Sequence, residues 1–312
     1  MRLRRLGRTG LDISELTLGT SALAAAARSD MAEARAMVAL ALDHGVNAIE
    51  IHAGDDVAVR LLGDVLRREN AGNRVHIFAR ATSLVAFDLP SPHVSVHHAY
   101  PGRYLRAETE ALLATLGVER LALQQLHAWC PEWQHEGDWL ETLDRLRAEG
   151  KIAGFGVSLF DHDVTAGLEI VASGLIDAVQ AMHNIFDPAP AKALFPLCQK
   201  HEVGVIARAP LYYGALGGAL DFAPDDWRHT YFFDAHRHET GERAERLRAE
   251  ATPPDRSVAD MALRFSLSHP AVSTVAVGMR SRAQLEANLQ AVLAGPLDAD
   301  RRATLAGHAW LC

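Results

Sequence analysis

Four ionisable residues stand at or just beyond the ends of short apolar runs: Glu50, His52, Arg80 and His127. A carboxylate or an imidazole at such a point can exchange a proton with a substrate, and a guanidinium can hold a carboxylate or phosphate through two parallel hydrogen bonds. We therefore hypothesise acid and base chemistry at Glu50 and His127, with Arg80 as an anion holder. A structural ion pair is an equal alternative for Glu50 and Arg80, and a buried structural histidine is the competing interpretation of His127.

The same residues include ligand types that Zn²⁺ or Fe²⁺ accepts, because Glu50, His52 and His127 supply a carboxylate and two imidazoles. Residues 50 and 52 would lie on one face of a strand. A guanidinium at Arg80 would repel a metal ion in the same place. We therefore predict no metal site.

The runs that carry these residues belong to a longer pattern, in which short apolar segments alternate with amphipathic ones. Such alternation is typical of repeated βα units and a parallel sheet. The strands expected are 14–18, 46–51, 75–79, 121–126, 152–157, 178–180, 204–207 and 274–277. The helices expected are 31–44, 57–69, 103–116, 139–149, 162–173, 190–201, 257–268 and 281–293.

Eight strands with eight helices predict an α/β fold, a (β/α)8 TIM barrel that spans residues 1–312 as one domain. A hairpin at 3–12 and a helix at 299–310 would be additions to it. Residues 212–254 are predicted to form a long loop with one helix, 240–251. In such barrels the active site lies at the carboxyl ends of the strands. The residues there are Gly19, Thr20, Glu50, His52, Arg80, His127, Ser158, Gln180, Arg208, Gly278 and Arg280.

Several motifs carry a resemblance to a known family: Arg5-Leu6-Gly7-Arg8-Thr9-Gly10-Leu11, Leu18-Gly19-Thr20, Gly156-Val157-Ser158 and Pro210-Leu211. Together they resemble the aldo-keto reductases, in particular the bacterial and potassium-channel-β-subunit-like branch. The resemblance implies the cofactor NADPH, with its adenosine part at the N-terminus of the last barrel helix. The cofactor-binding residues that it implies are Gly19, Thr20, Ser158, Gln180, Leu211, Gly278, Arg280, Gln284 and Asn288.

The chain departs from the family pattern around the nicotinamide. In the family, the second strand ends with Asp-Thr-Ala, followed by two residues and then Tyr-Gly. The corresponding residues 50–56 of this chain contain no tyrosine, and Arg80 stands where the family has a catalytic lysine. Leu159 stands where the family has an asparagine that, together with the serine at position 158, holds the nicotinamide carboxamide. Arg208 stands where the family has an aromatic ring that stacks on the nicotinamide, so a cation would face the oxidised ring. Only His127 matches the family's catalytic set. These departures predict an eroded nicotinamide site.

Tyrosines elsewhere offer a replacement acid: Tyr100, Tyr104, Tyr212, Tyr213 and Tyr231 lie in or beside the loops after the third and seventh strands. His52, Arg208 and Tyr213 are expected to contact the substrate.

Three functions follow from this pattern. The leading hypothesis is non-standard acid and base chemistry, such as dehydration, isomerisation or cyclisation, on a small and anionic molecule, with Arg80 and Arg208 as anion holders. The first alternative is an NAD(P)H-dependent carbonyl reductase or alcohol dehydrogenase with a displaced general acid. The second is a catalytically silent, NADPH-sensing regulatory subunit.

Composition narrows the partners. The formal net charge of −8 and the pI near 6.0 argue against a general nucleic-acid or anionic-membrane surface, which needs clustered Lys and Arg. Three cysteines without metal or disulfide spacing, and no run typical of a signal peptide or membrane span, predict a cytoplasmic protein. The oligomeric state is left open.

Overall fold

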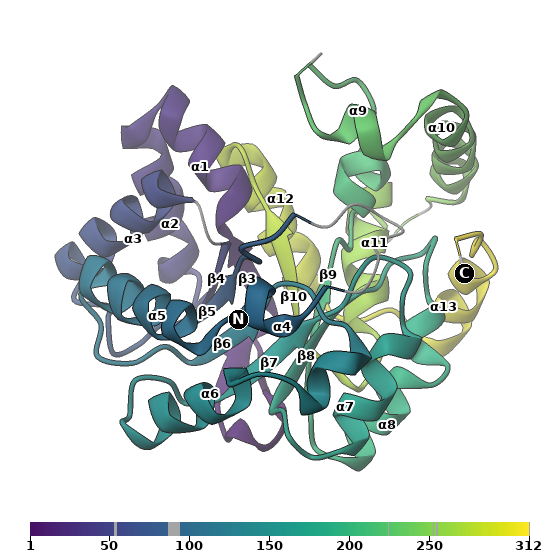
Figure 1. Ribbon diagram of the computed structural model, residues 1–312. Helices are drawn as coiled ribbons and strands as arrows, with labels where there is room; N and C mark the ends of the chain where they lie inside the picture. The colour runs from purple at the N-terminus through teal and green to yellow at the C-terminus, as the bar shows by residue number, and fades with distance from the viewer. Residues whose placement is uncertain (53–54, 87–93, 224, 252, 254, 312) are drawn as a thin grey trace.

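The computed structural model describes residues 1–52, 55–86, 94–223, 225–251, 253 and 255–311. Eight parallel strands close into a barrel with helices around its outside (Figure 1), which confirms the predicted (β/α)8 architecture. The strands are β3 (Leu16–Gly19), β4 (Ala48–His52), β5 (His76–Ala81), β6 (Leu123–Leu126), β7 (Phe155–Ser158), β8 (Ala178–Met182), β9 (Gly204–Arg208) and β10 (Val272–Gly278).

A predicted hairpin closes the amino-terminal end of the barrel. Strands β1 (Leu3–Arg5) and β2 (Asp12–Ser14) pair antiparallel, and Leu6 and Ile13 are buried with the pore residues Phe78, Leu123 and Ile206. The short 3₁₀ helix η1 (Gly7–Thr9) makes the turn. The pore is therefore filled below, and polar side chains can converge only at the carboxyl ends of the strands.

All eight predicted barrel helices are present, but two of them are shorter than predicted and follow a separate 3₁₀ turn. They are α2 (Met31–Asp43), α3 (Asp56–Arg68), α5 (Gly102–Leu116), α6 (Trp139–Ala148), α7 (Leu168–Ala172), α8 (Leu194–Lys200), α11 (Val258–Leu267) and α12 (Arg282–Ala294). The 3₁₀ turns η3 (Thr165–Gly167) and η4 (Ala189–Ala191) replace the first turns expected for α7 and α8. The predicted C-terminal helix is α13 (Ala299–Ala306), shorter than expected.

Two regions differ most from the prediction, and two short elements, α4 (Val96–Ala99) and η2 (Pro131–His135), were not expected either. Helix α1 (Thr20–Ser29) follows β3 directly and was not expected; it buries Leu23, Ala24 and Ala27. The segment after β9 holds η5 (Tyr212–Gly217), α9 (Arg228–Tyr231) and α10 (Asp234–Glu250) instead of one helix at 240–251. Helix α10 is charged on nearly every face and carries ion pairs between its own residues, so it shows no hydrophobic periodicity to reveal its start.

Aromatic residues pack densely beside the ends of β5 and β6. Trp129, Trp133 of η2 (Pro131–His135) and Trp139 are each at most 1% exposed, and their rings meet edge to face with centroids 5.5–6.2 Å apart. Tyr100, which follows α4 (Val96–Ala99), joins the same cluster.

Cys130 and Cys198 are free thiols, while Cys312 lies outside the described residues. None of the helices among the described residues is long and apolar enough to cross a membrane.

Candidate active site

Glu50 occupies the centre of the barrel mouth with both carboxylate oxygens engaged. Its Oε1 lies 2.6 Å from Arg80 Nη2, and its Oε2 accepts from Gln180 Nε2 at 2.7 Å. Strands β4 and β8 are not neighbours in the barrel, so this second bond crosses the pore. The ion pair that the sequence left as an equal alternative is therefore formed, and a base at Glu50 would have to release one of these partners.

His127 lies just beyond β6, with His52 beside it. The two imidazole rings meet edge to face with centroids 4.5 Å apart. Burial, followed by the charge of Arg80 and then by His52 and Arg208, lowers the pKa of His127 to about 2. His127 is therefore neutral at pH 7, which suits an N–H hydrogen-bond donor to a substrate oxygen and not an imidazolium acid.

Arg208 ends β9 and is neutralised by a residue that the sequence analysis did not single out. Its Nη2 lies 2.5 Å from Asp161 Oδ1 and donates to the Leu159 carbonyl at 2.8 Å. Tyr213 Oη donates to Asp161 Oδ2 at 2.6 Å and accepts from Arg208 Nη1 at 3.0 Å. Asp161 lies three residues past the end of β7, in a loop, where no strand-end rule would find it.

The two guanidiniums expected to clamp an anion thus each have an internal carboxylate. Arg80 pairs with Glu50, and Arg208 pairs with Asp161. Because Asp161 neutralises the charge of Arg208, it also removes much of the repulsion that an unpaired Arg208 would exert on an oxidised nicotinamide.

Several buried polar atoms at the mouth lack a hydrogen-bond partner among the described residues. They include Ser158 Oγ and Gln180 Oε1, whose residues are adjacent across β7 and β8 in the register Ser158 to Gln180. Both residues are 1% exposed. Buried polar atoms are nearly always paired in native proteins, so these atoms are available to a ligand or water bound at the barrel mouth. Gln125, two positions before His127, has both amide atoms in the same condition and was not anticipated.

Thr20 and Asp55 link the first two barrel strands. Thr20 Oγ1 donates to Asp55 Oδ2 at 3.0 Å and accepts from the His52 amide at 3.2 Å. The tyrosine of the family pattern would fall at position 55, where this chain has the carboxylate of Asp55 instead. Residues 53 and 54, which belong to the same stretch, lie outside the described residues.

The residues expected to hold the adenosine end gather where β10 meets α12. The Arg280 amide donates to Gln284 Oε1 at 2.8 Å, and Ser281 caps the helix through the Gln284 amide. Asn288 is 6% exposed on α12. Gly278 pairs in register with Gly19 of β3, so both backbones are close together there, and Leu211 precedes η5 after β9, the other neighbour of β10.

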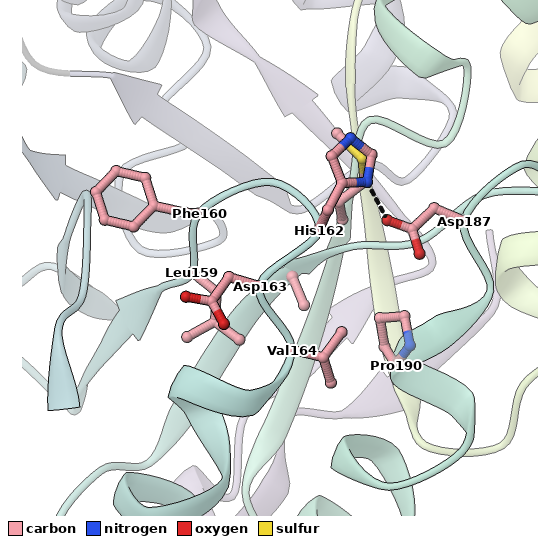
Figure 2. Close-up of a pocket in the computed structure, with 9 residues that line it drawn as sticks. Leu159, Phe160, His162, Asp163, Val164, Asp187 and Pro190 are labelled. Atoms are coloured by element: carbon pink, nitrogen blue, oxygen red, sulfur yellow. Dashed lines mark hydrogen bonds and ion pairs between the residues drawn. The ribbon is translucent and has the colours of Figure 1, made fainter. Parts of the chain in front are cut away.

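A small cavity lies outside this mouth, between the loops that follow β7 and β8 (Figure 2). It is lined by Leu159, Phe160, His162, Asp163, Val164, Ala181, Met182, Asp187 and Pro190 and is partly open to solvent. Its space does not admit even a water-sized sphere, whereas ligand pockets are usually some 300–1,000 Å³, so this hollow is too small for a dinucleotide. His162 Nδ1 lies 2.7 Å from the buried carboxylate of Asp187 there, and Nε2 lies 3.1 Å from the Tyr231 hydroxyl.

Comparison with known proteins adds to this geometry. The Aldo/keto reductase family model matches residues 15–309. The uncharacterized oxidoreductase YqkF of Bacillus subtilis (strain 168) is 27% identical over 99% of this chain and 96% of its own length. An L-galactose dehydrogenase of Arabidopsis thaliana is 25% identical over 94% of this chain and 88% of its own.

A solved structure extends the likeness to three dimensions. The holo form of an aldo-keto reductase from Bacillus halodurans superposes with a TM-score of 0.78 at 25% identity, covering 100% of this chain and 97% of that one. The two short motifs at the N-terminus, the barrel and the full-length match agree with one another, and the chain belongs to the aldo-keto reductase family.

Proposed function

We propose that the protein is an NAD(P)H-dependent oxidoreductase that interconverts an alcohol and a carbonyl group on a small polar molecule. The observation that carries this proposal is the orphaned pair Ser158 Oγ and Gln180 Oε1. A carboxamide has one carbonyl acceptor and an NH₂ donor, so a serine hydroxyl can donate to the one while a glutamine oxygen accepts from the other. The pair therefore fits the amide of a nicotinamide ring.

The other end of the cofactor has candidate partners as well. Arg280 is 54% exposed just before α12 and only loosely paired, with its Nη2 3.8 Å from Asp226 Oδ2; a guanidinium and a helix N-terminus both favour a phosphate there. This supports NADPH over NADH. Gly19, Thr20, Leu211, Gly278, Gln284 and Asn288 would line the remaining length. When bound, a nicotinamide cofactor supplies or accepts the hydride.

The chain's own residues would stabilise charge on the substrate oxygen. The neutral His127 donates an N–H hydrogen bond to that oxygen, and the guanidinium of Arg80 lies on the same side of the barrel, near enough to lower the pKa of His127. Glu50 holds Arg80 in place, and because the ion pair carries no net charge, Arg80 contributes N–H donors and not a free positive charge. Preorganised donors of this kind stabilise a developing oxyanion without reorganisation during the reaction.

Pairing of both arginines with carboxylates favours an uncharged, hydroxylated substrate over the anionic one that the sequence suggested. The L-galactose dehydrogenase among the relatives supports a sugar-like alcohol. We also propose the cytoplasm as the compartment, on the basis of the cysteine spacing.

Fluorescence titration with NADPH and NADP⁺ tests the proposal. We expect wild-type protein to bind with micromolar affinity and Ser158→Ala to bind about 2- to 10-fold more weakly, the value of one hydrogen bond. Ser273→Ala is the matched control, because Ser273 is also a buried strand serine but bonds the Arg5 carbonyl at the other end of the barrel. Absence of binding at millimolar cofactor would refute the proposal.

The two other functions make different predictions in the same assay. If the protein catalyses acid and base chemistry without hydride transfer, we expect no binding of NADPH or NADP⁺ in this titration. A silent sensor requires tight binding and no turnover of any aldehyde or alcohol.

A further inference from the structure

A phenol, a guanidinium and a carboxylate form a closed triangle beside the barrel mouth. Tyr213 Oη donates to Asp161 and accepts from Arg208, and Arg208 is also paired with Asp161. The side chains of Arg208 and Asp161 are 13% and 22% exposed, so water reaches the carboxylate but not freely. A phenol in this position has a proton acceptor on one side and a cation on the other.

The triangle borders the site described above. Arg208 ends β9, and its charge is one of the causes that lower the pKa of His127. Arg208 Nη2 also donates to the carbonyl of Leu159, the residue after Ser158, at 2.8 Å. Asp161 follows Ser158, one of the two orphaned residues, by three positions.

Backbone strain accompanies the triangle. Ala209, Tyr212 and Tyr213 have φ values of +49°, +44° and +54°, a left-handed conformation that residues other than glycine rarely adopt. Strain of this kind persists only where surrounding structure fixes it, and it concentrates at active sites. The segment from Ala209 to Tyr213, which includes the start of η5, therefore holds the Tyr213 ring in one orientation at a local cost in stability.

We propose that Tyr213 is the proton-transfer residue of this enzyme and that Asp161 receives its proton, an inference that rests on the oxidoreductase function proposed above. In alcohol oxidation, the substrate O–H bond breaks and its proton moves to Tyr213 Oη, while the phenol's own proton moves to Asp161 Oδ2. A bound oxidised nicotinamide would accept the hydride from the substrate carbon as the C=O bond forms. Asp161 then releases the proton to water. Carbonyl reduction follows the same steps in reverse.

The resting protonation states suit this direction. Burial raises the pKa of Tyr213; Arg208 opposes that rise and the Asp161 charge adds to it, so the phenol is neutral at pH 7. Burial alone would raise the pKa of Asp161, but the charge of Arg208 and the hydrogen bond from Tyr213 outweigh it and lower that pKa. A protonated phenol therefore faces an ionised carboxylate, which is ready to accept a proton.

The test compares Tyr213→Phe, which keeps the ring and removes the hydroxyl, with wild-type protein. We expect kcat to fall about 10²- to 10⁴-fold, the usual contribution of a general acid or base, while the Kd of NADPH stays unchanged. Asp161→Asn should also lower kcat and remove the acidic limb of the kcat–pH profile. Tyr212→Phe is the matched control, because the neighbouring Tyr212 hydroxyl bonds His236 and lies outside the triangle.

Other outcomes overturn the inference. If Tyr213→Phe keeps kcat within threefold of wild type, the relay is wrong, and a loss confined to Asp55→Asn would assign the role to Asp55. If Tyr213→Phe raises KM or cofactor Kd while kcat is kept, Tyr213 is only structural. Wild-type protein that binds no cofactor refutes the oxidoreductase proposal itself, and the relay with it, whereas normal binding with an unaffected Tyr213→Phe refutes the relay alone.

Discussion

At the residue scale, the ion pair between Glu50 and Arg80 is buried, with side-chain exposures of 6% and 12%. Removing one partner of such a pair leaves a charge without compensation and usually costs about 3–5 kcal/mol. We expect Glu50→Gln to lower the free energy of unfolding by about 3 kcal/mol in urea titrations. The double variant Glu50→Gln, Arg80→Gln should recover part of this loss, because neither charge is then left alone.

An exposed pair supplies the comparison. Glu141 is 64% exposed in its pair with Arg145, so Glu141→Gln should leave the urea midpoint unchanged. Equal midpoints for Glu50→Gln and wild type would show that Arg80 finds another partner and that the pair is not a structural requirement.

His127 makes a second prediction at this scale, which concerns the pH profile. Its pKa of about 2 means that it does not titrate between pH 5 and 9. His127→Gln, which retains an N–H donor, should therefore keep more activity than His127→Leu, which should lose about 10²-fold or more in kcat. An acidic limb near pH 6.5 that disappears in His127→Gln would instead identify His127 as an imidazolium acid.

At the scale of elements, the β1–β2 hairpin that fills the amino-terminal end of the barrel depends on Gly7. The φ of Gly7 is +49°, and a Cβ there would lie 2.3 Å from the Gly204 amide nitrogen of β9. Gly7→Ala must therefore displace the hairpin from the barrel. We expect a loss of unfolding free energy above 3 kcal/mol, measured by chemical denaturation. Gly10→Ala is the control, since Gly10 also has a positive φ, +72°, but open space at its Cβ, and it should cost only about 1–2 kcal/mol.

Much of the element pattern follows from the sequence, and the misses have physical causes. Apolar runs predict the barrel strands because such strands are buried on both faces. Helix α1 escapes notice because it starts directly at the end of β3, with no side-chain hydrogen bond at its N-cap. Strand ends place Glu50, Arg80 and His127 at one mouth, and the sequence also suggests Tyr213. Asp161 escapes notice because it lies in a loop three residues beyond β7, where its contacts with Arg208 and Tyr213 depend on the loop conformation.

At the scale of the whole molecule, buried histidines make stability depend on pH. Burial, with smaller effects from His269 and Arg302, lowers the pKa of His183 to about 3, and that of His127 is also depressed. Below the ordinary histidine pKa of about 6.5 the unfolded chain takes up protons that the folded one refuses, so their stabilisation is complete above pH 6.5 and is lost as pH falls toward 3.

His183→Phe tests this dependence, because the His183 ring already stacks on Phe265 with centroids 5.5 Å apart. Between pH 6.5 and 5.0 one such histidine contributes a loss of about 2 kcal/mol. We expect the variant to lose that much less of its unfolding free energy over this interval, as measured by urea titrations at both pH values. An identical acid loss in both proteins would mean that other groups cause the sensitivity.

Four of the five tryptophans divide the protein's intrinsic emission into two signals, and the fifth, Trp310, is half-buried against Phe186. Trp129, Trp133 and Trp139 pack together away from solvent, so they should emit at short wavelength and resist quenching by acrylamide. Trp227 is 56% exposed and its ring lies 5.0 Å from that of Tyr213. Trp227→Phe should therefore remove a quenchable, long-wavelength component of the emission. That component reports the position of the segment after β9 that holds η5 and α9, while the remaining emission reports whether the barrel is folded.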